Sequence, residues 1–382
     1  MLKTKQIPFN KPHFLGTEHA YIRKAIEYGQ ISGNGFFTKQ CHQFFKDLYG
    51  FNKVLLTTSC TDALEMSAIL AGISPGDEVI VPSYTFPSTA NAFVLRGAKI
   101  VFADSGKNHP NMDISKLPSL ISSKTKAIVP VHYAGVACEM NQLMTLAKEH
   151  NLIVVEDAAQ AIDSFYQDQP LGKIGHFGTF SFHETKNLSS GEGGLLTIND
   201  AQFEDRSEII WEKGTNRSAF FRGEVKKYGW VDIGSSFLPS DVIAALLFAQ
   251  LENLTFIQEK RIAIWNQYYE GLKPLAEKGY FSLPHIPTYA TNNAHIFYLV
   301  CLSLEERTAL IAFLKKRGIS AIFHYLPLHT SDFYKGRHDG RKLPYVDMYS
   351  DCLLRLPLYI GLEEEVAYII ENITEFYSNG KN

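Results

Sequence analysis

The sequence predicts an α/β protein in which a mostly parallel β-sheet is covered by helices on both faces. Between residues 53 and 157, short apolar runs alternate with stretches whose apolar positions recur at helical spacing. The run over 152–155 is apolar at every position, as expected of a strand buried on both faces. Later the alternation is less regular, and 382 residues suffice for two domains. We expect a large α/β domain over 1–250, including an N-terminal arm, and a smaller α+β domain over 251–382.

The first half of the chain has the more regular pattern. A polar arm leads to a helix expected over residues 17–28 and then to a loop over 31–38. The expected strands are 54–56, 79–82, 100–102, 127–131 and 152–157, and the expected helices between them are 61–70, 85–95 and 140–149. The loop contains Gly33 and Gly35, but no strand precedes them and a third glycine is absent. A dinucleotide-binding fingerprint is therefore not predicted.

The second half begins with a short apolar strand over 179–182 and a glycine-rich turn. The next expected elements are a helix over 201–211, a loop over 214–223, a long helical region over 240–272, and strands near 295–302 and 321–323. In open parallel sheets, ligands bind beyond the carboxyl ends of the strands. The polar clusters of this chain follow expected strands, which makes them the candidates for a site.

The composition is that of a globular protein, with 45% hydrophobic residues, 20% charged residues and a net charge of −3. This balance gives no basis for binding nucleic acid or an anionic membrane. The five cysteines are scattered without a C-x-x-C pair, which favours reduced thiols. Neither a signal-peptide pattern nor an apolar run of the ~18 residues needed for a membrane span is evident. We expect a cytoplasmic protein of the size of an enzyme.

Lys186 stands between the strand at 179–182 and the glycines Gly191, Gly193 and Gly194. Lysine is usually a solvated surface residue, whereas glycines let the backbone approach a ligand closely. An amine withdrawn from water has a lowered pKa and attacks carbonyl groups. Two hypotheses stay open from this stretch alone. Lys186 is either an ordinary loop lysine or the lysine that binds pyridoxal phosphate (PLP) covalently.

Two neighbouring acids, Glu156 and Asp157, end the apolar strand at 152–157. A carboxylate beside a pyridine nitrogen keeps that nitrogen protonated, so the ring accepts electrons. Because side chains alternate along a strand, only one of the two acids would face a ligand. From the residues alone, an acid that caps the next turn is the simpler interpretation.

A polar turn, Thr57-Thr58-Ser59-Cys60-Thr61, joins the strand at 54–56 to the next helix. Hydroxyls and free N–H groups at a helix N-terminus form an anion site that suits a phosphate. Simple N-capping by Ser59 or Thr61 is the alternative. Cys60 has no histidine or basic neighbour in the sequence, so we expect a small buried residue and not a nucleophile.

Aromatic and histidine residues give further candidates. Tyr84, at the end of the strand at 79–82, would either stack on a flat ring or belong to the core. His324 and His329 are five positions apart, which does not fit the i, i+4 pair of a zinc helix, and the intervening proline excludes a regular helix. We expect no metal site, and we interpret His324, Tyr325 and His329 as substrate contacts.

Taken in order, T-S-C-T, S-Y-T-F, V-E-D-A-A-Q, S-F-H-E-T-K-N and the glycine-rich turn resemble the DegT/DnrJ/EryC1/StrS family of nucleotide-sugar aminotransferases. The resemblance covers nearly the whole chain. It implies the aspartate aminotransferase-like architecture, which is fold type I of the PLP-dependent transferases. It also implies PLP as the cofactor and a homodimer as the assembly.

The resemblance implies a role for each matching residue. Lys186 would bind the cofactor covalently and move protons, and Asp157 would pair with the pyridine nitrogen. Gln160 would lie near the ring hydroxyl, and Tyr84 would lie against the ring face.

The phosphate of the cofactor would be held by Ser59, Cys60 and Ser181. Members of the family often add an Asn of the second subunit to this phosphate site. The corresponding segment here, residues 234–238, reads G-S-S-F-L and lacks that Asn. Ser236 is therefore the candidate for the contact across the subunits.

Longer stretches, among them G-D-E-V-I-V-P-S-Y-T-F and E-K-G-T-N-R-S, resemble family members that make an amino sugar for the enterobacterial common antigen. This implies transfer of an amino group from L-glutamate to dTDP-4-keto-6-deoxy-D-glucose. The product would be dTDP-4-amino-4,6-dideoxy-D-galactose, for that antigen or an O-antigen.

Several alternatives stay open. A related enzyme would give the gluco epimer at C4 or a 3-amino sugar. A PLP-dependent sugar dehydratase of similar sequence carries His where Lys186 stands, so the lysine argues against it. A non-catalytic regulator would need the loss of Lys186 or Asp157, and both residues are present.

Overall fold

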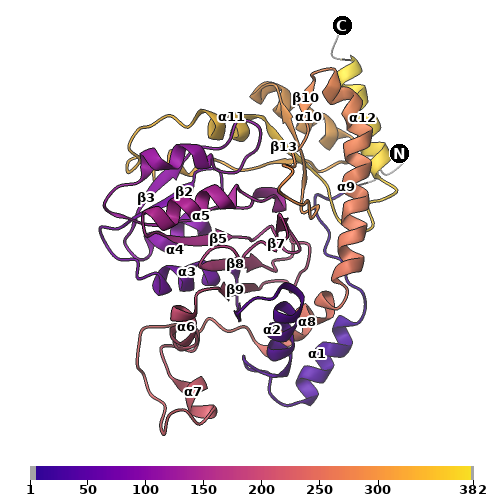
Figure 1. The fold of residues 1–382 in the computed structure, drawn as a ribbon. Helices are drawn as coiled ribbons and strands as arrows, with labels where there is room; N and C mark the ends of the chain where they lie inside the picture. The colour runs from indigo at the N-terminus through magenta and orange to yellow at the C-terminus, as the bar shows by residue number, and fades with distance from the viewer. Residues whose placement is uncertain (1–5, 380–382) are drawn as a thin grey trace.

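A seven-stranded sheet forms the centre of the larger part of the molecule in the computed structural model, which describes residues 6–379 (Figure 1). The strand order is β1-β9-β8-β5-β4-β2-β3. These strands are β1 (Lys53–Thr57), β2 (Glu78–Pro82), β3 (Lys99–Ala103), β4 (Thr125–Ile128), β5 (Ile153–Asp157), β8 (Phe177–Ser181) and β9 (Gly194–Ile198). Strand β9 is antiparallel to both of its neighbours, and the other neighbouring pairs are parallel. The predicted mostly parallel sheet is confirmed.

Helices cover both faces of this sheet. They are α1 (Glu18–Glu27), α2 (Phe36–Tyr49), α3 (Cys60–Leu70), α4 (Pro87–Val94), α5 (Met140–Glu149), α6 (Glu204–Trp211) and α8 (Asp241–Leu251). The short helix α7 (Arg217–Phe221) lies away from the sheet, on a segment that projects from the molecule (Figure 1). Successive residues of one strand belong to two different hydrophobic clusters, one on each face of the sheet. In β1, Val54 packs with residues of α2 and α8, whereas Leu55 packs with residues of α3. In β5, Val154 likewise belongs to the first cluster and Val155 to the second. Both faces of the strand are therefore buried, which explains why the run is apolar at every position.

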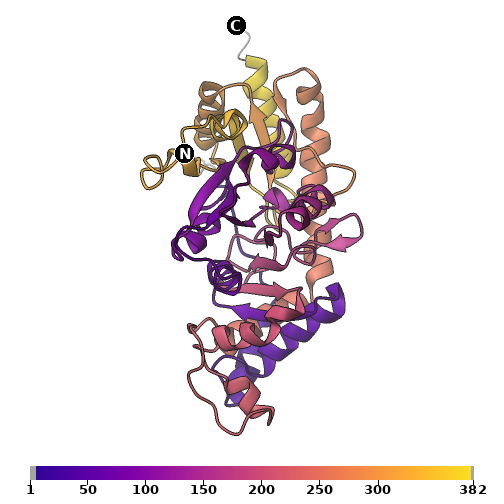
Figure 2. The same ribbon diagram turned by 60° about the vertical axis from the view of Figure 1, so that its left-hand side comes forward.

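A four-stranded antiparallel sheet and its helices form the C-terminal part, which Figure 2 shows gathered at one end of the molecule, opposite α1 and α7. Its order β10-β11-β13-β12 joins β10 (Phe281–Ser282), β11 (Phe297–Cys301), β13 (Leu353–Leu356) and β12 (Ile322–Phe323). Its helices are α9 (Leu254–Glu277), α10 (Leu304–Lys316), α11 (Pro344–Cys352) and α12 (Val366–Asn379).

The remaining elements are short. They are the hairpin of β6 (Phe165–Tyr166) and β7 (Gln169–Pro170), and the 3-10 helices η1 (Ile114–Leu120), η2 (Tyr133–Gly135), η3 (Ala201–Phe203) and η4 (Leu328–Thr330). The division into domains over 1–250 and 251–382 stays a prediction. The outer ends of these ranges, 1–5 and 380–382, lie outside the described residues.

Helix α2 begins inside the loop expected over 31–38. The carboxylate of Asp241 in α8 accepts hydrogen bonds from the backbone N–H groups of Phe37 and Thr38, at 3.1 and 2.8 Å. These bonds satisfy N–H groups that have no partner within the helix. Because Asp241 is about two hundred positions away, the local sequence pattern could not reveal this cap.

The helical region expected over 240–272 consists of two helices, α8 and α9, which are separated at Glu252 and Asn253. The amide of Asn253 donates a hydrogen bond to the carbonyl of Ala249, at 2.9 Å. Asn commonly competes in this way with regular helical bonding. The break turns the chain from the central sheet toward the C-terminal sheet, and Figure 1 shows α9 running alongside both.

Candidate active site

Lys186 lies in a closed loop that follows the carboxyl end of β8. The N–H of Ser190 donates to the carbonyl of Phe182, and the N–H of Glu184 donates to the carbonyl of Gly191, both at 2.9 Å. These two backbone bonds hold the loop against the sheet. Desolvation lowers the pKa of the Lys186 amine from 10.5 to about 8. A larger fraction of this amine is therefore neutral and nucleophilic near neutral pH than of an ordinary lysine.

The residue after it, Asn187, is buried and fixed from three sides. Its amide group donates to the side chain of Gln258 in α9 and to the carbonyl of Asn293, both at 2.8 Å. Its side-chain oxygen lies 2.9 Å from Nδ1 of His295. Burial lowers the pKa of His295 well below its usual range, so this ring is neutral and donates through Nδ1. The backbone next to Lys186 is thus held by the C-terminal part of the chain.

The two acids at the end of β5 have different surroundings. Glu156 is fully buried and accepts hydrogen bonds from Nε2 of His132 and from the backbone N–H groups of Gly172, Ile174 and Gly175, at 2.6–3.0 Å. These bonds tie the chain before β8 to the sheet. They occupy both oxygens of Glu156, which leaves it no capacity to serve a ligand.

Asp157 points to the other side of the strand. It accepts one hydrogen bond from Oγ1 of Thr89 in α4, at 2.7 Å, and one from the backbone N–H of Ala159, at 3.2 Å. Desolvation raises the pKa of Asp157, and the charge of Lys186 opposes this shift. A cationic partner would stabilise the ionised form of such a carboxylate.

The N-terminus of α3 meets the ends of β8 and β9 at a cradle of polar groups. Gly194 pairs with Ser181 across the sheet, and a Cβ atom at Gly194 would lie 2.3–2.5 Å from backbone atoms of Ser59 and Cys60. The hydroxyl of Ser59 caps the helix by accepting from the N–H of Asp62, at 3.1 Å. Ser59, Cys60 and Ser181, predicted as phosphate contacts, thus lie side by side at a helix N-terminus.

Cys60 is buried, and desolvation raises the pKa of its thiol. A thiol in this state is a poor nucleophile. The N–H of Cys60 makes no hydrogen bond within residues 6–379, so it remains able to bind an anion.

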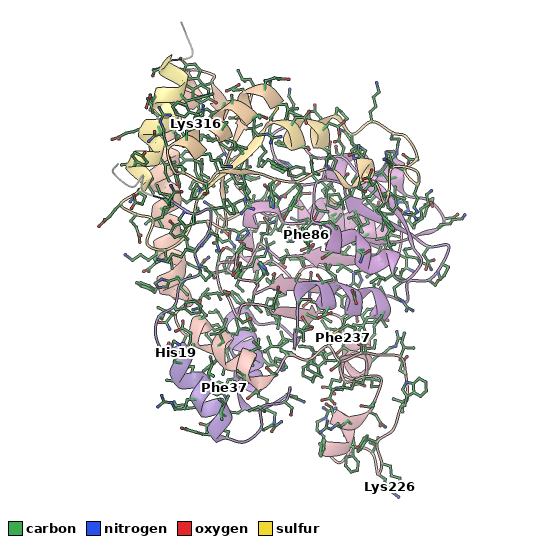
Figure 3. All side chains as sticks on the ribbon, turned by 180° about the vertical axis from the view of Figure 1, so that it is seen from behind. His19, Phe37, Phe86, Lys226, Phe237 and Lys316 are labelled. Atoms are coloured by element: carbon green, nitrogen blue, oxygen red, sulfur yellow. The ribbon has the colours of Figure 1, made fainter. Side chains whose placement is uncertain are left out.

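Tyr84 and Phe86 differ sharply in exposure. Tyr84 is 1% exposed, and its ring centroid lies 5.4 Å from that of Tyr133 and 5.8 Å from that of Tyr325. Phe86 is 58% exposed at the start of α4, 6.4 Å from the ring of Tyr325 (Figure 3). Phe86 therefore exposes much of its ring near Tyr325, and the sequence analysis did not single it out.

Gln160 connects the central sheet to the loop after β12. Its side-chain oxygen accepts from the N–H of Ala134, at 2.7 Å, and its amide donates to the hydroxyl of Tyr325, at 3.2 Å. His324 lies 3.2 Å from the hydroxyl of Tyr133. Two of the three predicted substrate residues, His324 and Tyr325, therefore lie in the same region as Gln160.

His329 lies apart from this group. Its Nδ1 is 2.8 Å from the hydroxyl of Ser83, which also accepts from the backbone N–H of His329. Its Nε2 is 3.6 Å from Asp347. This histidine joins the loop after β12 to the end of β2.

Ser236 is exposed, and it pairs with Glu212 as an isolated β-bridge. The carbonyl of its neighbour Phe237 accepts from the N–H of Thr58, at 2.9 Å. The segment with Ser236 therefore borders the polar turn of its own chain.

Arg355 in β13 was not predicted as a site residue. It is 8% exposed, and its Nη1 lies 3.2 Å from Nε2 of His324. Its charge contributes to the lowered pKa of Lys186. The sequence R-L-P-L around it contains no known motif that would have indicated this position.

Other classes of site find no support in the described part of the chain. Among residues 6–379, no group of three or more His, Cys, Asp or Glu side chains is arranged to hold a metal ion. None of the helices there is both long enough and apolar enough to span a membrane.

A family model described as the DegT/DnrJ/EryC1/StrS aminotransferase family matches residues 15–374. This range contains both sheets and the loop of Lys186. The chain belongs to this family. Aminotransferases of this family act with PLP, so the predictions of family, fold type I architecture and cofactor are confirmed.

Relatives of known name support the same assignment. The chain is 32% identical to GDP-perosamine synthase of Escherichia coli O157:H7, over 98% of this chain and 100% of that protein. It is 31% identical to the spore coat polysaccharide biosynthesis protein SpsC of Bacillus subtilis, over 97% of this chain and 96% of that protein. The PLP form of the sugar aminotransferase Spr1654 of Streptococcus pneumoniae has a TM-score of 0.89 at 27% identity, covering 98% of this chain and 99% of that one.

The candidate site of the present chain suits PLP in three respects. An amine with a lowered pKa suits the carbonyl of the cofactor. A buried carboxylate suits its pyridine nitrogen. The N-terminus of α3, with the hydroxyls of Ser59 and Ser181 beside it, suits its phosphate.

Proposed function

We propose that this chain transfers an amino group from L-glutamate to dTDP-4-keto-6-deoxy-D-glucose. The product is dTDP-4-amino-4,6-dideoxy-D-galactose, used for a surface polysaccharide such as the enterobacterial common antigen or an O-antigen. The observation that carries the transaminase chemistry is the desolvated Lys186 amine close to the carboxylate of Asp157. The choice of sugar rests on the long sequence stretches around P-S-Y-T-F and G-T-N-R-S.

When bound, PLP supplies a carbonyl group that takes up the amino group and a ring that accepts electrons. Nζ of Lys186 holds the cofactor and moves the proton at C4 of the sugar. The carboxylate of Asp157 keeps the pyridine nitrogen protonated, and the hydrogen bonds from Thr89 and Ala159 support this role by fixing its orientation. Gln160, held by Ala134 and Tyr325, would contact the ring hydroxyl of the bound cofactor.

The phosphate is bound by Ser59, Cys60 and Ser181 at the N-terminus of α3. The ring of Phe86 stacks on the ring of the cofactor, and its exposure supports this role. The buried ring of Tyr84 then contributes by packing beneath the site.

His324 and Tyr325 contact the substrates, and their hydrogen bonds with Tyr133 and Gln160 support this assignment. His329 contributes by fixing the same loop through Ser83.

The protein acts in the cytoplasm as a homodimer, in which Ser236 contacts the phosphate of the neighbouring subunit. The segment from α7 to Ile233 supports the dimer because it projects from the molecule, and Figure 3 labels Lys226 at its tip. It exposes the apolar side chains of Phe221, Tyr228 and Trp230. Exposed aromatic side chains that occur together on one segment favour an interface.

The test is to incubate the protein with dTDP-4-keto-6-deoxyglucose, glutamate and PLP and to determine the structure of the product. The face of sugar C4 that receives the proton decides the epimer. A small coupling between H3 and H4 of the sugar supports the galacto product. A large coupling would identify the gluco epimer, and an amine at C3 would refute the proposed position.

A GDP-linked keto sugar is the second candidate, because a relative of 32% identity is a GDP-perosamine synthase. Parallel assays with dTDP- and GDP-linked 4-keto-6-deoxy sugars separate the two. Faster turnover of the GDP-linked sugar, at equal concentration, would overturn the dTDP assignment.

A further inference from the structure

Asn293 is a buried amide that joins two segments of the candidate site. It precedes β11 in the chain and is 1% exposed. Its side-chain N–H groups donate to the carbonyls of Gln160 and Ile162, both at 2.8 Å. Its own backbone carbonyl accepts from the side-chain amide of Asn187, also at 2.8 Å. One residue therefore contacts Gln160 on one side and the neighbour of Lys186 on the other.

The side chain of Asn293 also packs against the turn that holds Gln160. A Cβ atom at Gly135 would lie 2.0 Å from Oδ1 of Asn293, so the contact requires a glycine there. The residue before this glycine, Ala134, donates its N–H to the side-chain oxygen of Gln160, at 2.7 Å. The backbone of Gln160 is thus held by Asn293, and its side chain is held by the turn packed against Asn293.

The residue after Asn293 has a backbone conformation that is uncommon for residues other than glycine. Ala294 has a φ of +51°, in the left-handed region, and it is fully buried. The guanidinium of Arg261 in α9 donates to the carbonyls of Ala294 and His295, at 3.1 and 2.7 Å. Strained backbone persists where surrounding contacts enforce it, and it occurs often at functional sites. These contacts hold the segment that presents Asn293 in one conformation.

The two segments joined by Asn293 serve neighbouring positions of one ring. The carbonyl group that reacts with a lysine and the ring hydroxyl stand on adjacent carbon atoms of PLP. Groups that act together on one ligand need relative positions accurate to about 0.5 Å. Within residues 6–379, the bond to Tyr325 uses one of the two N–H groups of the Gln160 amide, so the other remains for the ring hydroxyl.

We propose that Asn293 is a positioning residue that fixes Gln160 relative to Lys186. The proposal rests on the proposed function, because it takes these two residues as contacts of the cofactor. The side chain of Asn293 holds the segment of Gln160, whereas its backbone carbonyl holds Asn187 beside the lysine. A substitution at this position should therefore release Gln160 and leave the lysine in place.

A local role in the turn is the alternative. Oδ1 of Asn293 accepts from the N–H of His295, two positions later, at 3.0 Å, which is the bond of an Asx turn. Serine and threonine make a similar turn through their hydroxyl groups. Their side chains are one atom too short to replace the amide nitrogen. Asn293→Ser and Asn293→Thr should therefore keep the turn and lose the bonds to Gln160 and Ile162.

The experiment titrates the visible absorption of the PLP-loaded protein with pH. The lysine nitrogen and the ring oxygen share one proton, and a donor to that oxygen favours the form that has lost the proton. Both Asn293 variants should raise the pKa of this chromophore by about half to one pH unit, as for the loss of one hydrogen bond. Gln160→Ala should raise it at least as much. Its combination with Asn293→Ser should add nothing, because both changes act through one group.

Asn372 provides the matched control. It is also buried, and its amide donates to the carbonyl of Tyr368 in α12, at 2.7 Å. Asn372→Ala should lower the melting temperature and leave the pKa of the chromophore unchanged. Borohydride should still attach the cofactor to Lys186 in Asn293→Ser, because the backbone carbonyl that holds Asn187 remains.

Three results would overturn the proposal in a protein that is yellow and labelled on Lys186. A chromophore pKa equal to that of the wild type in both Asn293 variants would leave Asn293 a role in its turn alone. Shifts that add in the double variant would show that Asn293 acts separately from Gln160. An equal shift in Asn372→Ala would show a general effect of lost stability. A wild type without visible absorption would instead refute the proposed function, and this inference with it.

Discussion

The chemistry of single residues in this protein depends on how far each is removed from water. Lys186 and Asp157 are both desolvated, which lowers the pKa of the amine and raises that of the carboxyl group. Each shift favours the neutral form. Glu156, one residue away, accepts hydrogen bonds from the backbone N–H groups of Gly172, Ile174 and Gly175 and therefore has a structural role.

The lowered pKa of Lys186 predicts a pH dependence of stability in the PLP-free protein. Between about pH 8 and pH 10.5, the unfolded chain binds this proton and the folded protein does not. The free energy of unfolding should therefore gain a contribution that rises with pH in this window. Chemical denaturation at several pH values measures it. Lys186→Met should remove the rise, and an equal rise in both proteins would contradict the assigned pKa.

Asp157→Asn and Glu156→Gln should separate catalysis from folding. Asp157→Asn should keep the melting temperature and lose most of the activity, because a neutral amide lacks an ionic hydrogen bond of roughly 1.5–3 kcal/mol. Glu156→Gln should lower the melting temperature, since its NH₂ group would face backbone N–H donors. Thermal denaturation and initial rates measure both. Near-normal turnover in Asp157→Asn would refute its role.

At the scale of elements, the cradle depends on the close approach of α3 to β9. Gly194 permits this approach because it has no side chain. The carbonyl oxygen and N–H of the helix start then lie beside the end of β8, where Ser181 stands.

Gly194→Ala should therefore weaken PLP binding. Its Cβ would lie 2.3 Å from the carbonyl carbon of Ser59, so α3 or β9 must shift. We expect PLP affinity to fall by about tenfold or more, as for the loss of one charge-assisted hydrogen bond. Fluorescence titration with PLP measures the affinity. Gly336→Ala is the control, because a Cβ there meets no atom within 4 Å. Equal affinity in the two variants would contradict the account.

The sequence predicted the strands of the central sheet better than the contacts between distant elements. Continuous apolar runs such as 152–155 identify strands buried on both faces, and the polar turns after them mark the site. The start of α2 was missed because its cap, Asp241, comes from α8. Arg355 was missed for a similar reason: its position next to Thr185 results from the docking of β13 beside the loop of Lys186.

At the scale of the whole molecule, the segment between α6 and α8 projects from the rest of the chain, and we expect it to form the interface of the proposed homodimer (Figure 1). Trp230 is 83% exposed there, in a segment with other exposed aromatic side chains. When a partner covers an apolar surface of this kind, the free energy of the complex is lowered.

Trp230→Ser should weaken the proposed homodimer. Burial of an aromatic side chain at an interface commonly makes a large contribution to binding, so we expect a loss of about 2 kcal/mol or more. Sedimentation velocity over a concentration series measures the change. Leu302→Ser is the control, since Leu302 is 71% exposed and lies on the C-terminal part. A wild type that is monomeric and fully active at assay concentration would refute the dimer.

The most direct test of the central claim is borohydride reduction of the PLP-loaded protein, followed by mass spectrometry of its peptides. The account predicts a yellow protein that is bleached by the reagent and carries one cofactor on Lys186. Lys186→Ala should bind PLP without a covalent link and should lose transamination. A colourless wild type, or a cofactor attached to a different lysine, would contradict the account.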